Sequence, residues 1–124
     1  NNQDVLPIYS DLTVNGPAVE VCSINSFGQF NRLSNRRFLR FTVDAAGSHT
    51  IRVVGPINSD PDLALFRNGF LNQSADIVES EETLTQPLAT GTYVLEAYEA
   101  SNVFGGNDFG RPPGKTCLDV TVTR

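Results

Sequence analysis

Alternation of apolar and polar residues with a period of two recurs along this chain, and no other feature limits its folds as strongly. Successive side chains of a β-strand point to opposite faces of the sheet, so the alternation indicates strands with one buried and one solvated face. The alternating runs are residues 19–22, 39–43, 50–53, 63–65, 93–97 and 118–123. We predict a β-strand at each of these places.

Turn-forming residues separate the runs, at residues 45–48, 55–61, 67–69, 89–91 and 104–114. Asn68 and Gly69 both tolerate positive φ, so residues 63–66 should form a hairpin with the segment that follows. Residues 73–82 are the only candidate helix, and because they lack an apolar stripe we expect a loop or one short turn there. Many short strands separated by turns predict an all-β fold, an antiparallel, jelly-roll-like β-sandwich of about eight strands.

Length and charge narrow the classes of function. A chain of 124 residues, of which 40% are hydrophobic, suits one folded domain, and we expect residues 1–124 to form a single, monomeric β-sandwich domain. The net charge of −5 would repel a phosphate backbone, which argues against nucleic-acid binding. No apolar run approaches the roughly 20 residues that span a bilayer, so we expect no transmembrane segment. The sequence begins with Asn1 and has no methionine, which suggests an excised or processed part of a longer protein.

The two cysteines, Cys22 and Cys117, each fall in a predicted strand near one end of the chain. Each alternates with the apolar residues of its strand, so each sulfur belongs to the face opposite the main apolar set. This placement permits a disulfide between two neighbouring strands at a sheet surface. A disulfide would favour a secreted, periplasmic or cell-surface location, whereas two buried free thiols in a cytosolic protein are the alternative.

Four segments in order, FLRFTVDAAGSHTIRVVG, DPDLALFRNG, GTYVLEAYEA and CLDVTVTR, together resemble the bacterial pre-peptidase C-terminal domain. The likeness covers about residues 36–124 and is carried by residues 41–43, 62–66 and 91–93. It implies a secreted β-sandwich without catalytic activity, located beside a protease or other exoenzyme domain. In some relatives such a domain helps the enzyme engage an insoluble substrate such as matrix protein, and in some it binds calcium. The chain differs from the usual pattern at Pro61 and in its two cysteines.

Asp60 and Asp62 precede and begin an apolar strand, and two explanations fit them. Calcium binds six to eight oxygens, so the pair could start a site that backbone carbonyls and a distant Asp108 or Asp119 complete. Alternatively, carboxylates and Pro61 at a strand start protect a sheet edge from pairing with other chains. The cofactor prediction is therefore either none or Ca²⁺.

Three aromatic residues are candidates for ligand binding. Tyr98 lies on the strand face opposite Tyr93, where an outward ring could stack on a sugar or a peptide, although half-buried tyrosines are also common without a ligand. Phe104 and Phe109 lie in a glycine-rich loop and would form an adhesive patch if exposed, or would otherwise fold back over the core. The nearby acids Glu79, Glu81 and Glu82 are most simply a solvated face.

Catalytic chemistry has little support in the sequence. His49 is the only histidine, it sits in the predicted turn AAGSHT and we expect it at the surface, and neither a GxSxG nor an HExxH motif is present. We therefore expect a non-catalytic accessory domain that binds an extracellular macromolecule, either a protein matrix or a polysaccharide, or that targets or stabilises an attached exoenzyme. The alternative is a calcium-assisted carbohydrate-binding or cell-surface adhesion module.

Overall fold

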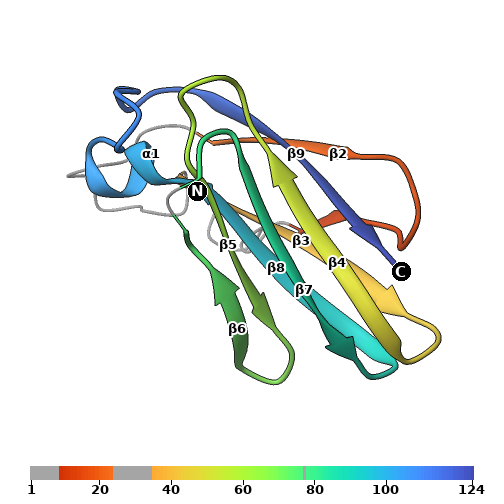
Figure 1. Ribbon diagram of the computed structural model, residues 1–124. Helices are drawn as coiled ribbons and strands as arrows, with labels where there is room; N and C mark the ends of the chain where they lie inside the picture. The colour runs from red at the N-terminus through yellow and green to blue at the C-terminus, as the bar shows by residue number, and fades with distance from the viewer. Residues whose placement is uncertain (1–8, 24–34, 77) are drawn as a thin grey trace, which may run out of the picture.

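The computed structural model describes residues 9–23, 35–76 and 78–124, which form strands with one short helix (Figure 1). The strands are β1 (Tyr9–Asp11), β2 (Val19–Ser23), β3 (Arg36–Val43), β4 (Gly47–Val54), β5 (Pro61–Phe66), β6 (Phe70–Ser74), β7 (Glu81–Leu88), β8 (Gly91–Glu99) and β9 (Thr116–Thr123). The helix, α1 (Ala100–Phe104), lies between β8 and β9.

Two sheets pack face to face. The first has the strand order β1-β3-β8-β5-β6 and the second has the order β2-β9-β4-β7. Every neighbouring pair is antiparallel except β1 and β3, which are parallel. The prediction of an all-β sandwich is confirmed, with nine strands among the described residues where about eight were expected. β5 pairs with β6 across Asn68 and Gly69, as the turn residues predicted.

The core lies between the sheets and consists of the apolar residues of the alternating runs. Those that are at most 2% exposed are Leu39, Phe41, Val43, Ile51, Val53, Leu63, Leu65, Tyr93, Leu95, Ala97, Leu118, Val120 and Val122. Burying an aliphatic or aromatic side chain contributes about 1.5–3 kcal/mol, so this set is the main source of stability. Among the described residues, no helix is long and apolar enough to cross a membrane.

The Gly-Thr-Tyr segment at the start of β8 joins the core to a neighbouring turn. The Tyr93 ring stacks on Phe41 with 5.5 Å between ring centroids, and its hydroxyl donates a hydrogen bond to the carbonyl oxygen of Ala89 at 2.8 Å. The Arg67 guanidinium also lies over the Tyr93 ring, 5.3 Å from its centroid. Gly91 has a φ of 143°, and a Cβ there would lie 2.8 Å from Arg67, so only glycine fits this position.

The cysteines form the disulfide that their strand positions permitted. Cys22 on β2 and Cys117 on β9 are direct register partners on the outer face of the second sheet, and their sulfurs are bonded. The bond joins an edge strand near the start of the chain to its last strand, across a sequence separation of 95 residues. The alternative of two free thiols is therefore wrong for this structure.

Two predictions about local structure are wrong. His49 lies within β4 rather than at the surface; it is 2% exposed because strand alternation places it on the same face as Ile51 and Val53, and its Nδ1 lies 2.7 Å from the carbonyl oxygen of Gly47. Residues 73–82 are not one loop, since β6 ends at Ser74 and β7 begins at Glu81.

Candidate functional site

Three connecting segments meet at one end of the sandwich: the β4–β5 loop (55–60), the β6–β7 loop (75–80) and the segment after α1 (105–115). They lie opposite the β3–β4 and β7–β8 hairpins (Figure 1). Hydrogen bonds tie them together: the Ser80 N–H donates to the carbonyl oxygen of Ser59 at 2.7 Å, and Asn107 Nδ2 donates to that of Asn58 at 2.9 Å. We call this region, residues 55–60, 75–80 and 105–115 with the adjoining strand ends, the loop end.

Three carboxylates are buried at the loop end. Asp60 ends the β4–β5 loop, Asp62 lies on β5 and Glu82 lies on β7; they are 6%, 4% and 3% exposed. Asp60 Oδ1, Asp62 Oδ1 and Glu82 Oε2 are buried without a hydrogen-bond partner. A buried carboxylate oxygen without a hydrogen-bond partner is unfavourable, so a proton or a bound cation would stabilise these three atoms.

Protection of a sheet edge does not explain Asp60 and Asp62. β5 pairs with β8 along its whole length but with β6 only from Leu63 to Phe66, so Asp62 lies beyond the end of the β6 ladder. Asp60 and Asp62 are nevertheless 6% and 4% exposed, so neither presents a solvated carboxylate at an open edge. Pro61 fits the start of β5 but is itself buried there. Edge protection relies on solvated acids, so the burial of Asp60 and Asp62 argues against it, and the calcium explanation stays a prediction.

Burial and mutual repulsion change the protonation of these acids. Burial, followed by the charges of Glu99 and Glu82, raises the pKa of Asp60 to about 6. Burial, followed by the charge of Asp60, raises the pKa of Asp62 to about 8, and burial also raises the pKa of Glu82. Without a cation Asp62 therefore retains its proton at neutral pH, whereas a divalent cation would take the place of that proton and stabilise the ionised carboxylates.

Glu99 fixes the position of Asp60 from the end of β8. Glu99 is fully buried, and its Oε1 accepts hydrogen bonds from the Asp60 N–H at 2.6 Å and from Asn107 Nδ2 at 2.8 Å. Its Oε2 accepts a hydrogen bond from the Ser101 N–H and so caps α1. Because hydrogen bonds already occupy both of its oxygens, Glu99 holds the β4–β5 loop, α1 and the segment after α1 together rather than offering a free ligand atom.

The predicted metal ligands divide into two groups. Asp108 is exposed at the loop end, and it lies close enough to Asp60 for its charge to raise the pKa of that residue. Asp119 lies on the outer face of the second sheet, opposite Glu20 in the register, and is not part of the group. Sequence reasoning missed Glu82 and Glu99. Glu82 was assigned to a solvated face, which is wrong, since it faces inward opposite Val53.

The donor atoms suit a hard cation. Carboxylate and carbonyl oxygens are the ligands of calcium, which takes six to eight of them at 2.3–2.6 Å. The oxygens of Asp60, Asp62 and Glu82 do not all lie within 4.8 Å of one another, so they do not form a ready-made site. Asp62 is the register partner of Tyr98 on the outer face of the first sheet, whereas Glu82 faces inward from the second sheet. In the described chain, Glu20, Cys22 and Cys117 meet that distance, but the two sulfurs are bonded to each other and are not thiolate ligands.

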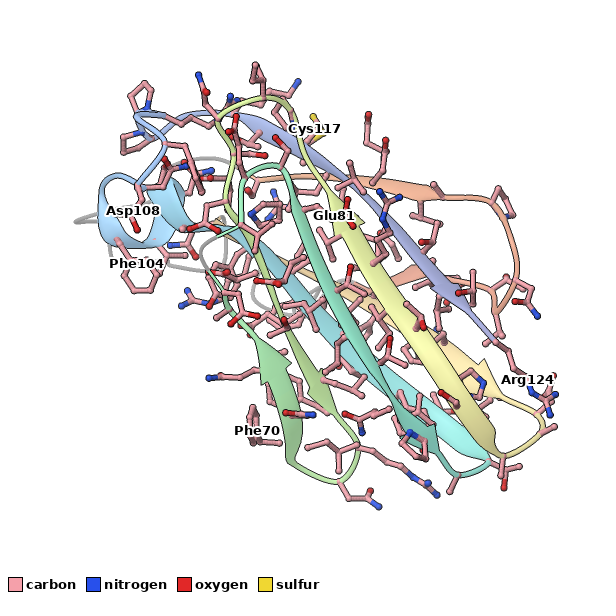
Figure 2. The ribbon with its side chains drawn as sticks, in the orientation of Figure 1. Phe70, Glu81, Phe104, Asp108, Cys117 and Arg124 are labelled. Carbon is pink, nitrogen blue, oxygen red and sulfur yellow. A yellow bond between two sulfur atoms is a disulfide. The ribbon has the colours of Figure 1, made fainter. Side chains whose placement is uncertain are left out.

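The predicted aromatic binding residues occupy different environments. Tyr98 lies on the outer face of the first sheet, half-buried, and the Arg36 guanidinium covers its ring at 5.5 Å from the centroid. Burial, followed by the charge of Asp62, raises the pKa of Tyr98 to about 12. Phe104 is 67% exposed at the end of α1, and Phe109 is partly buried. Figure 2 shows Phe104 and Asp108 together at the loop end. The binding role of these aromatic residues stays a prediction.

No protein family model matches the sequence. No curated protein matches it either. Among solved structures, the chain is similar to the pre-peptidase C-terminal domain of a collagenase from Bacillus anthracis, with a TM-score of 0.65, 13% identity, and coverage of 92% of this chain and 93% of the other. The chain has the fold of a pre-peptidase C-terminal domain. This pre-peptidase C-terminal fold confirms, at the level of architecture, the resemblance that the sequence indicated.

A second solved structure shares this fold. It is CorA, described as a surface-associated copper-binding protein important in copper acquisition in Methylomicrobium album BG8. The TM-score is 0.60 and the identity is 10%, with coverage of 92% of this chain and 97% of CorA. Identities this low establish the shared fold alone, so function must be argued from the loop end itself.

Proposed function

We propose that this chain is a non-catalytic accessory domain of a secreted, periplasmic or surface-located bacterial protein. Its role is to bind an extracellular macromolecule, or to target or stabilise an attached exoenzyme such as a protease. Three observations support this proposal: the fold shared with the pre-peptidase C-terminal domain of a collagenase, the disulfide that suits an oxidising compartment, and the burial of His49 away from the loop end.

The loop end takes part in this function as a calcium site. The observation that carries this step is the set of unpartnered oxygens of Asp60, Asp62 and Glu82, buried where a charge is unfavourable without a counter-charge. Asp108 at the surface adds a fourth carboxylate near Asp60. Calcium would supply the missing positive charge and fix the loops in one arrangement.

CorA is described as a copper-binding protein, but the residues of this chain do not support a copper site. Copper prefers imidazole, thiolate and thioether ligands. The chain has one histidine, which is buried against Gly47, two cysteines that are joined in a disulfide, and no methionine. The donor set of the loop end is made of oxygen atoms and favours calcium.

Calcium titration tests the metal step. We expect millimolar calcium to raise the melting temperature by several degrees, since a ligand at 100 times its Kd stabilises the folded state by about 2.7 kcal/mol. Asp62→Asn should reduce this response, and Asp44→Asn, which changes an exposed acid in the β3–β4 turn, should leave it intact. An unchanged melting temperature of the wild-type protein at millimolar calcium would remove calcium from the proposal.

The ligand class requires a separate experiment. Sedimentation with insoluble collagen, chitin and bacterial cell wall, with calcium or with a chelator, should retain the domain on at least one matrix. Glycan stacking on Tyr98 is the less favoured mode, since Arg36 covers the ring. Retention on chitin that is lost in Tyr98→Ala would instead support the carbohydrate-binding alternative. Failure to bind any matrix would leave only the role of steadying an attached enzyme.

A further inference from the structure

Negative charge is concentrated at the loop end. Eight of the 14 acidic residues lie there, namely Asp60, Asp62, Asp76, Glu79, Glu81, Glu82, Glu99 and Asp108. Among the described residues, Arg111 and Lys115 are the basic residues of the same segments. One divalent cation at the buried carboxylates would still leave the exposed Asp76, Glu79 and Asp108 as a negative rim. The surface is therefore complementary to a positively charged partner.

Large apolar side chains are exposed on the same segments. Ile57 is 75% exposed on the β4–β5 loop, Val78 is 47% exposed on the β6–β7 loop, and Phe104 is 67% exposed on α1. Each of the three segments of the loop end, or its adjoining helix, thus presents one apolar side chain to solvent. Exposed apolar groups rimmed by polar ones are typical of protein interaction sites.

The loops that carry these side chains are braced against one another. The Asn58 N–H donates to Glu79 Oε2 at 2.9 Å, and the Ser80 hydroxyl donates to the carbonyl oxygen of Pro56 at 2.9 Å. Arg111 Nη1 donates to the carbonyl oxygen of Ile57 at 3.4 Å. Ile57 is therefore bound through its backbone, and its side chain remains free for contact. A surface braced in this way loses little freedom on binding.

We propose that the loop end is a docking surface for a protein segment that carries both basic and apolar side chains. The apolar side chains of the partner contact Ile57, Val78 and Phe104, and its arginine or lysine residues pair with Asp76 and Asp108. This inference deepens the proposed function by naming the class of partner. An anionic membrane or polysaccharide is disfavoured, because the rim stays negative after one divalent cation has bound.

Three fluorescent peptides of equal length test the proposal: one with alternating arginine and leucine, one with glutamate in place of arginine, and one with serine in place of leucine. Fluorescence anisotropy with the intact domain in calcium should detect the arginine–leucine peptide alone, with affinity that falls as salt is raised. The double variant Ile57→Ser/Phe104→Ser should weaken this binding about tenfold, as expected for exposed hot-spot residues.

Matched variants distinguish binding at the docking surface from nonspecific hydrophobic adsorption of the peptide. Phe70→Ser removes an equally exposed phenylalanine, 59% exposed on β6 and away from the loop end, and should leave affinity unchanged (Figure 2). Asp76→Asn/Asp108→Asn should weaken binding, and Asp44→Asn should not. Equal loss in Phe70→Ser, equal binding of the arginine–serine peptide, or preferential binding to phosphatidylserine vesicles would overturn the proposal.

Two results distinguish failure of the docking inference from failure of the proposed function. If Ile57→Ser/Phe104→Ser keeps wild-type binding to collagen or cell wall, the domain binds through another surface and the docking inference is wrong. If the domain binds no matrix but binds the arginine–leucine peptide through Ile57 and Phe104, the docking inference stands and its partner is the attached protein.

Discussion

Asp62 shows at the scale of one residue how a fold can hold a charge that it does not stabilise by itself. Its carboxylate lies on an inner strand, 4% exposed, with Oδ1 unpartnered and with the charges of Asp60 and Glu82 nearby. A well-packed hydrophobic residue at this position would stabilise the sheet more, so the carboxylate lowers the stability of the fold. Such a group is expected at a binding site, where the ligand compensates the buried charge.

The pH dependence of stability should reveal this arrangement in calcium-free protein. The folded pKa values, about 6 for Asp60 and about 8 for Asp62, lie above the ordinary value of 3.8 that holds in the unfolded chain. Their contribution is therefore fully present below about pH 4 and is lost as the pH rises through 6 and 8. Urea unfolding in a chelator should show falling stability from pH 5 to pH 8.5. A flat profile, or an identical profile in Asp62→Asn, would contradict these protonation states.

Glu99 is the residue on which the geometry of the loop end depends. We expect Glu99→Gln to lower the free energy of unfolding by about 2 to 3 kcal/mol, because a charged acceptor of buried hydrogen bonds is lost and an amide N–H₂ faces the Ser101 or Asp60 N–H. Urea denaturation measures the loss. Glu81→Gln, which breaks an exposed pair with Arg52, should have a much smaller effect; equal losses would remove the special role of Glu99.

At the scale of elements, the strands that sequence could predict are those with an uninterrupted apolar face. Alternation alone predicts β2, β3, β4, β5, β8 and β9. β7 escaped prediction because Glu82 and Gln86 occupy two of its inward positions and break the apolar period. α1 has only five residues, and it depends on its Glu99 cap and on the left-handed Gly105, contacts that no periodicity shows.

The residues of the candidate site also differ in whether the sequence could predict them. Asp60 and Asp62 could be found because two acids beside an apolar strand are conspicuous. Glu82 and Glu99 come from other strands, and only the packing of the two sheets brings them to the loop end. Glu99 did carry one signal, since it follows Tyr93, Leu95 and Ala97 on the inward face of β8, where a charge demands a partner.

The disulfide between β2 and β9 is an element-scale constraint that reduction can test. Closing a loop of this length contributes about 4 to 5 kcal/mol in the chain-entropy account. Dithiothreitol should therefore shift the urea midpoint to lower concentration, and Cys22→Ser/Cys117→Ser should reproduce that shift and no longer respond to the reductant. An unchanged midpoint on reduction would show that pairing of β2 with β9 holds without the bond.

On the scale of the whole molecule, the structural residues and the candidate binding residues occupy different parts of the sandwich. The apolar core holds the two sheets together and the disulfide ties β2 to β9 within the second sheet, while the carboxylates and the exposed Ile57 and Phe104 lie at one end. Such separation lets the loop end change its protonation or bind a cation while the sheets remain intact. The fold supplies the frame, and the loop end supplies the binding chemistry.

Calorimetric titration of calcium at pH 7 in Pipes and in Tris, whose ionisation enthalpies differ, tests the central claim most directly. Because Asp62 has a pKa of about 8 in the calcium-free state, binding should displace a proton, and the observed heat should depend on the buffer. Asp62→Asn should bind calcium more weakly and release fewer protons. Absence of any binding heat in the wild-type protein, or equal heats in the two buffers, would contradict a calcium site at these buried carboxylates.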